Sequence, residues 1–320
     1  MVSGGLMGSA SELMSPRQVA RALGVSESSL KRWCDRGLIE AVRTAGGHRK
    51  LMVSDVINFV RKNDHALVSP EVLRLPSITE KSRLGLDDAQ SRLTDALLVG
   101  DVFLAKQIVL DLYLDKHSLA TIFDDVVAEA FVEIGRRWEC KTADVYQERR
   151  ACTIIMRALD EIRRLQKPSH GTWSAIGGTL EPDRYILPTT MSELVLAGLG
   201  FSAQSLGVGI PASSMAKAIR EIRPHLYWLS LSHIPDANAC LGDVSTLANA
   251  CSDAGAVLVV GGRAITADIR QRLECATVCD NMRQLESFAK SMQRLANRQT
   301  KPHSSGRKRR RTSSTKNPST

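Results

Sequence analysis

Short helices separated by glycines are predicted near the start of the chain. One begins at Ser15–Gln18, where serine caps the helix, proline takes its first position and Gln18 completes a capping box, and it ends at Gly24. Ser26 caps a second, basic helix, which carries Trp33 on its inner face and ends at Gly37. Two short helices joined by a tight turn form the helix-turn-helix pattern, whose second helix enters the major groove of DNA.

A cationic hairpin, or wing, is predicted to follow. Its tip is Thr44–His48, which contains two glycines, and its arms include Ile39–Arg43 and Arg49–Leu51. Such a wing can lie along the DNA backbone or in the minor groove, because arginine and lysine bond phosphates and base edges. We expect Trp33 in the core and DNA contacts from the polar and cationic residues around it. These are Ser28, Lys31, Arg32, Arg43, His48, Arg49 and Lys50.

The region 84–167 has helical periodicity and contains no proline. Its apolar positions repeat at intervals of three and four, and breaks fall at Gly100-Asp101, His117-Ser118 and Cys140–Asp144. This pattern predicts a four-helix bundle. The segments 65–83 and 168–183 contain prolines or glycines and lack sustained periodicity, so they are predicted to be linkers.

Short apolar runs alternate with helical patterns over residues 184–297. The predicted strands are Tyr185–Pro188, Phe201–Leu206, Leu226–Leu231, Ala256–Val260 and Ala276–Cys279. Five such units predict a doubly wound parallel sheet of the flavodoxin type, in which ligands bind at the carboxyl ends of the strands. The predicted fold class is therefore multidomain: a winged helix-turn-helix head (15–64), a helical bundle and an α/β domain. Gly261-Gly262 follows a strand and allows close backbone approach to a phosphate or nucleotide, although paired glycines also form plain turns.

Charge is concentrated at the two ends of the chain. The 320 residues carry a net charge of +9, with ten Lys/Arg against four acids in 15–62 and eight Lys/Arg against none in 298–320. Cationic surfaces bind phosphate polyanions by releasing counterions, so DNA is the expected partner. The segments 1–14 and 298–320 are too polar or too short to pack and are predicted to be disordered, the latter as a basic tail that adds affinity for DNA or keeps the chain soluble.

Several classes of protein are disfavoured. The longest apolar stretches, such as Ala256–Val260, fall far below the ~18–20 residues that a membrane span needs. Residues 1–14 lack a basic segment followed by an apolar core, so no secretion signal is expected. Seven cysteines without a CxxC pair favour a reduced cytoplasm over a disulfide framework. No P-loop, H-E-x-x-H or G-x-S-x-G motif is present, so we expect no enzymatic activity.

Ser29–Trp33, Arg36–Ile39 and Arg43–Arg49 together resemble the winged helix-turn-helix of MerR-type regulators. Such a head before a four-helix bundle and a flavodoxin-like domain is similar to the CarH/CarA/LitR class, which uses adenosylcobalamin as a light sensor. The resemblance implies that Trp138 shields the adenosyl group above the cobalamin and that Glu148 contacts it. The family's neighbouring histidine is Arg149 here, so we expect no light-generated adduct through that position.

Two of the three cobalamin-loop signatures of that class resemble segments of this chain. Leu229–Ser232 and Val259–Gly262 match them, which implies that Ser230, Ser232, Gly261 and Gly262 bind the cofactor. The third signature, Asp-x-His-x-x-Gly after the first strand, supplies the lower cobalt ligand, and Pro188–Leu194 contains no histidine. The stretch before Gly200 also looks several residues short, which predicts a truncated helix. We therefore expect cobalamin binding to be weakened or lost, and we assign no metal ligand.

The leading interpretation is a sequence-specific transcriptional regulator of the MerR type. It would bind a double-stranded DNA operator as a homo-oligomer, and its degenerate cobalamin-sensor-like half would control oligomerisation. One alternative is a corrinoid carrier or methyltransferase-like protein, against which the missing histidine counts. Another is a DNA-binding head fused to a ligand-free protein-interaction module.

Overall fold

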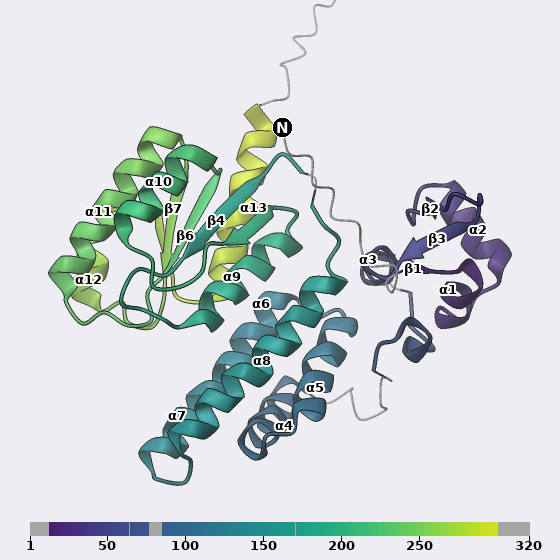
Figure 1. Ribbon diagram of the computed structural model, residues 1–320, viewed down its shortest axis with the longest axis horizontal. Coiled ribbons are helices and arrows are strands. Elements are labelled where there is room, and N and C mark those ends of the chain that lie inside the picture. The colour runs from purple at the N-terminus through teal and green to yellow at the C-terminus, as the bar shows by residue number, and fades with distance from the viewer. Residues whose placement is uncertain (1–12, 64, 77–84, 170, 300–320) are drawn as a thin grey trace, which may run out of the picture.

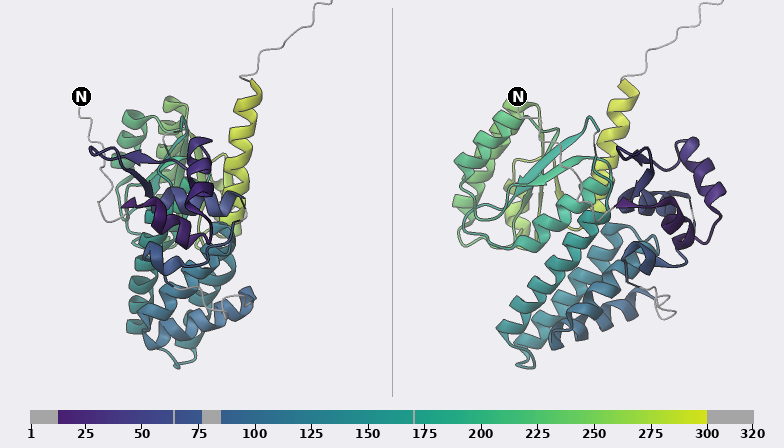
Figure 2. Two further views of the ribbon diagram at one scale, coloured as in Figure 1. Left: turned by 90° about the vertical axis from the view of Figure 1, so that its right-hand side faces the viewer. Right: turned by 45° about the vertical axis from the view of Figure 1, so that its right-hand side comes forward.

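The computed structural model describes residues 13–63, 65–76, 85–169 and 171–299, which form a head, a helical bundle and an α/β domain (Figure 1). The head and the α/β domain sit at the same end of the bundle (Figure 2). No helix in these ranges combines the length and the apolar composition that crossing a membrane requires.

The head is a winged helix-turn-helix. It consists of β1 (Leu13–Met14), α1 (Pro16–Ala22), α2 (Glu27–Asp35), β2 (Val42–Arg43), β3 (Arg49–Met52), α3 (Val53–Asn63) and the 3-10 helix η2 (Pro70–Leu73). The predicted capping box is present, with the Gln18 backbone N–H donating to Ser15 Oγ at 3.3 Å and the Ser15 N–H to Gln18 Oε1 at 2.9 Å. Gly47 has φ +77° at the tip of the wing, a conformation that side chains other than glycine rarely adopt.

Two predicted boundaries of the head are wrong. Leu13 and Met14 are not disordered, because they form β1 and pair with β3 in the sheet order β1-β3-β2. The part of the predicted linker up to residue 76 packs against α1: the backbone N–H groups of Val68 and Ser69 donate to Ala22 O, and Leu73 is buried. Residues 1–12, the remainder of the linker at 77–83, and 300–320 of the predicted tail lie outside the described ranges.

The bundle follows its predicted breaks. Its elements are α4 (Leu86–Val99), α5 (Val102–Leu114), α6 (Leu119–Thr121), the π-helical segment η4 (Ile122–Ala128), α7 (Glu129–Glu139) and α8 (Val145–Leu165). Gly100 ends α4 with φ +85°, and Asp101, Ser118 and Asp144 cap the helices that follow the three breaks. Local capping chemistry therefore set these boundaries.

The α/β domain has the predicted flavodoxin-like sheet. Its elements are β4 (Ser174–Gly178), α9 (Ile186–Gly198), β5 (Ser202–Ser205), α10 (Ala212–Ile222), β6 (Leu226–Ser230), α11 (Ala237–Ala254), β7 (Val257–Gly261), α12 (Ala267–Arg272), β8 (Thr277–Cys279) and α13 (Met282–Gln299). All strands are parallel in the order β5-β4-β6-β7-β8. Side chains of α10 and α11 cover one face, and those of α9 and α13 cover the other.

The predicted first strand is wrong. Tyr185 is the N-cap of α9 and residues 186–188 form its first turn. The true first strand is β4, which lies inside the segment 168–183 predicted as a linker. Ser174–Gly178 has weak intrinsic β-propensity, and its two neighbouring strands, the edge strand β5 and the central strand β6, supply the pairing that stabilises it. Gly177 is required there, because a Cβ at this position would lie 2.2 Å from the Trp228 ring.

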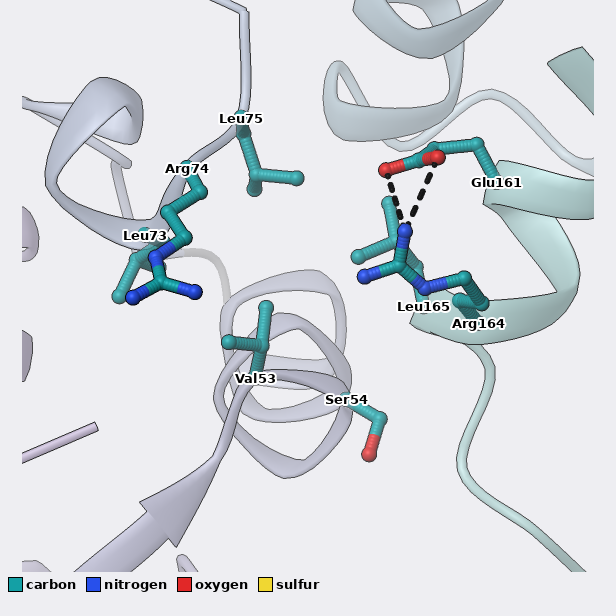
Figure 3. Close-up of a pocket in the computed structure, with 8 residues that line it drawn as sticks. All are labelled: Val53, Ser54, Leu73, Arg74, Leu75, Glu161, Arg164 and Leu165. Atoms are coloured by element: carbon teal, nitrogen blue, oxygen red, sulfur yellow. Dashed lines mark hydrogen bonds and ion pairs between the residues drawn. The ribbon is translucent and has the colours of Figure 1, made fainter. Parts of the chain in front are cut away.

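Charged groups join the head to the body of the molecule. Lys167, after α8, lies 2.7 Å from Glu40 and 3.2 Å from Asp55 of the head, and burial raises the pKa of Asp55. Arg61 of α3 donates to the backbone oxygens of Tyr113 and His117 at the end of α5, the latter at 3.0 Å. A cavity of about 60 Å³ beside this seam is lined by residues of α3 and α8 and by the segment from Leu73 to Leu75 (Figure 3).

Candidate functional sites

The exposed surface of α2 and the wing carries cations that have no acidic partner among the described residues. Lys31 and Arg32 project from α2, and Arg43 lies on the wing, all of them exposed. Within the described ranges, no carboxylate forms an ion pair with these three residues or with half-buried Lys50. Ser28 and His48 are exposed on the same two elements, and Ser28 Oγ lies 2.9 Å from Ser26 Oγ of the helix cap. Unpaired cations on a helix and a wing are the electrostatic footprint of a nucleic-acid interface.

Arg49 differs from the other predicted contacts. Its Nη2 lies 2.7 Å from Asp35 Oδ1 at the end of α2, and the side chain is half-buried. Its Nη1 is buried and has no hydrogen-bond partner among the described residues. This ion pair ties the first residue of β3 to the recognition helix and so sets the position of the wing.

Trp33, predicted to lie in the core, is half-buried and packs against the core of the head. Its ring packs 4.9 Å from Phe59 of α3 and 4.7 Å from His65. The sequence pattern did not single out His65. Its ring stacks on Phe59 with the two ring centroids 5.1 Å apart, so the three rings pack against one another. These aromatic contacts hold α2 against α3, so the cationic face of α2 is presented from a rigid support.

The predicted cofactor residues form two separate groups. Trp138 lies in the last turn of α7 and is 53% exposed. Glu148 lies in the first turn of α8, and its carboxylate is 3.9 Å from the Arg149 guanidinium. In the described ranges, the ion pair between α8 and α9 lies near the other end of α8, where Arg163 pairs with Glu193 at 2.8 Å. Arg163 follows Glu148 by fifteen positions of the same helix, which is roughly 22 Å along the axis. No hydrogen bond or ion pair in the described ranges joins the two groups.

The second group lies at the carboxyl edge of the sheet, around a carboxylate that sequence reasoning missed. Asp183 is 1% exposed and accepts hydrogen bonds from the backbone N–H groups of Ser232 (2.5 Å), His233 (3.2 Å) and Tyr185 (2.9 Å). It therefore bridges the loop after β4 to the loop after β6. Ser230 is buried at the end of β6, and the buried Ser232 Oγ has no partner among the described residues.

The position of β4 changes the register of the loop motif. Read after β4, the spacing Asp-x-His-x-x-Gly falls on Asp183-x-Tyr185-x-x-Pro188, so tyrosine stands at the histidine position and proline at the glycine position. The expectation of a truncated helix is wrong, because α9 runs for 13 residues from Ile186 to Gly198. The histidine is absent in this register too.

Gly261 and Gly262 are used by the chain's own backbone. A Cβ on Gly262 would lie 2.1 Å from Leu231 O, and one on Gly261 would lie 2.8 Å from Cys279 O. The Leu231 N–H donates to Gly261 O at 2.8 Å. The close approach that the glycines permit is therefore to the loop after β6 and to β8, and the pair offers no open cradle to a ligand.

The described residues contain no cluster of three or more His, Cys, Asp or Glu side chains that could hold a metal ion. Met191 is buried in the core beside the bundle. His233 is exposed in the loop after β6. All seven cysteines are unpaired.

Two domain families match the chain. A helix-turn-helix domain matches residues 13–64, and a B12 binding domain matches residues 89–163, which span the bundle from α4 to α8. The chain carries a helix-turn-helix domain and a B12-binding domain. No curated protein matches it in sequence.

One solved corrinoid protein shares its fold with about two thirds of this chain. The monomethylamine corrinoid protein of Methanosarcina barkeri is 13% identical, with a TM-score of 0.56 over 65% of this chain and 100% of that chain. A cobalamin-binding protein from Desulfitobacterium hafniense DCB-2 is 16% identical, with a TM-score of 0.35 over 66% of this chain and 98% of that chain. At these identities the likeness to the first structure shows the fold alone.

Proposed function

We propose that this chain is a sequence-specific transcriptional regulator of the MerR type that binds a double-stranded DNA operator. The observation that carries the proposal is the set of exposed cations on α2 and the wing that have no acidic partner in the described ranges. The helix-turn-helix match over residues 13–64 supports it. The unpaired cysteines agree with a reduced, cytoplasmic setting.

The residues of the head would make different kinds of contact with DNA. Lys31 and Arg32 lie on the recognition helix and would reach base edges and phosphates in the major groove. Ser28, near the start of the same helix, is placed for a phosphate. Arg43, His48 and Lys50 would grip the backbone from the wing, and Arg49 would position the wing through Asp35.

The proposal is tested by selecting DNA from a random duplex library on the full-length protein. Titration of the enriched sequence by fluorescence anisotropy follows, at several salt concentrations. Arg32→Ala should weaken binding about tenfold or more if the side chain reads a base. Lys217→Ala removes the same charge from the exposed face of α10 and should leave the affinity unchanged. A library in which no sequence is enriched over random DNA would refute the proposal.

We further propose that the bundle and the α/β domain control oligomerisation and that the protein is not an enzyme. The fold likeness to a corrinoid protein keeps a corrinoid carrier or methyltransferase component as the second candidate. Against it stand Tyr185 at the position of the family's lower ligand and the separation of Trp138 from the carboxyl edge of the sheet. If bound, cobalamin would supply the cobalt chemistry of such a carrier.

A further inference from the structure

We infer that the crevice at the carboxyl edge of the sheet is filled permanently by the chain's own Trp228, so that no nucleotide tail of a corrinoid can insert there. The chain leaves β4 towards β5 on one side and returns to β6 on the other, so the strand order reverses between β4 and β6. In open parallel sheets this reversal opens the crevice in which ligands bind. The inference does not depend on the proposed DNA-binding function.

Trp228 occupies the space between these two strands and the start of α9. It is 2% exposed, and its ring lies so close to β4 that a Cβ on Gly177 would be 2.2 Å from it. Its Nε1 donates to Thr189 Oγ1 of α9 at 3.0 Å, and Thr189 is fully buried. The indole N–H therefore has a hydrogen-bond acceptor and the rings are buried, as is usual for a tryptophan in a hydrophobic core.

The rim above Trp228 is also closed by the chain. Asp183 binds the backbone of Ser232 and His233, which draws the loop after β4 onto the loop after β6. Gly262 lies against the Leu231 backbone, so the loop after β7 also packs against the loop after β6. A tail that entered between β4 and β6 would have to break these backbone hydrogen bonds and expel a satisfied, buried indole.

The inference separates a corrinoid with a tail from one without. Cobinamide has the corrin ring of cobalamin but lacks the nucleotide tail, so a site that accepts the tail prefers cobalamin. A site that excludes the tail treats the two alike. The full-length protein is dialysed to equilibrium in the dark against adenosylcobalamin and, in parallel, against adenosylcobinamide, and the bound corrinoid is measured by its absorption.

We expect either that the protein retains neither corrinoid or that the two dissociation constants agree within about twofold. Cobalamin binding at least about tenfold tighter than cobinamide binding, a difference of about 1.4 kcal/mol, would overturn the inference. The affinity for the operator, measured on the same preparation, tests the head separately. A corrinoid result that overturns the inference therefore leaves the DNA-binding proposal intact, and a failure to bind DNA leaves the inference about the α/β domain intact.

Discussion

Trp228→Ala should open the filled crevice and make the α/β domain responsive to free indole. Truncating a fully buried tryptophan costs about 3–5 kcal/mol, because the transfer energy of the rings is lost and a cavity remains. The Thr189 hydroxyl also loses its donor, although Ser205 Oγ lies 3.4 Å away and can take over in part. At roughly 2–4 °C per kcal/mol, the melting temperature should fall by about 6–20 °C.

Indole should then restore part of this stability, because it fits the space that the side chain has left. A ligand that binds only the folded state stabilises it by about 2.7 kcal/mol at one hundred times its dissociation constant. The assay is urea unfolding followed by far-ultraviolet circular dichroism, with and without indole. Trp138→Ala removes the same ring from a position that is 53% exposed, so it should cost little and gain nothing from indole.

Two results would refute the reasoning. A loss below about 1 kcal/mol in Trp228→Ala would show that the indole is not a packed element of the core. Equal stabilisation of the wild type, Trp138→Ala and Trp228→Ala by indole would show that the ligand binds elsewhere. Should Trp228→Ala fail to fold, Thr189→Val offers a milder variant, which leaves the indole N–H without an acceptor at a cost of about 1–3 kcal/mol.

Three further predictions concern charge and thiol chemistry. Lys167→Met should lower the free energy of unfolding in urea by about 1–3 kcal/mol, because it leaves buried Asp55 without its cation. Burial already raises the Asp55 pKa, so the carboxylate is protonated more readily at pH 5 than at pH 8. The loss of stability should therefore be larger at pH 8. Two arginines hold the Glu133 pKa at about 2, so its stabilisation is present above its ordinary pKa of 4.5 and is lost as the pH falls towards 2. The melting temperatures of Glu133→Gln and the wild type should therefore converge between pH 6 and pH 3, and a constant gap would contradict this. Iodoacetamide at pH 8 should alkylate exposed Cys140 before Cys152, whose pKa burial raises to about 11, as peptide mass spectrometry can show.

Features encoded by neighbouring residues were predictable from the sequence. The capping box at Ser15–Gln18 and the break at Gly100 depend on contacts within a few residues, so a pattern of side chains and glycines suffices to place them. The alternation of strands and helices after residue 200 predicted a doubly wound parallel sheet, because parallel strands need helical crossovers between them. The fold class followed from such local signals.

Features that depend on distant partners were not predictable. β4 consists of small residues apart from Ile176, and its burial comes from β5, β6 and the Trp228 ring, which lie 24 or more positions away in sequence. Misplacing this strand shifted the loop motif and concealed Asp183, whose hydrogen bonds reach Ser232 across the switch point. The pairing of Arg49 with Asp35 was hidden for the same reason, since charge alone does not tell a phosphate contact from an internal ion pair.

The contacts of α8 indicate how the body of the molecule could control the head if no tail enters the sheet. Arg61 of the head lies on the carbonyl end of α5, where the helix dipole favours a cation, and Lys167 holds Asp55 just beyond the end of α8. The same end of α8 binds α9 through Arg163 and Glu193. A movement of α8 caused by association of two bundles would therefore change the position of the head.

We expect operator binding to depend steeply on protein concentration and to be the same with and without adenosylcobalamin, in the dark and in light. Anisotropy titrations under these four conditions test this, and a change of more than about threefold caused by cobalamin or light would show that the α/β domain still transmits a corrinoid signal.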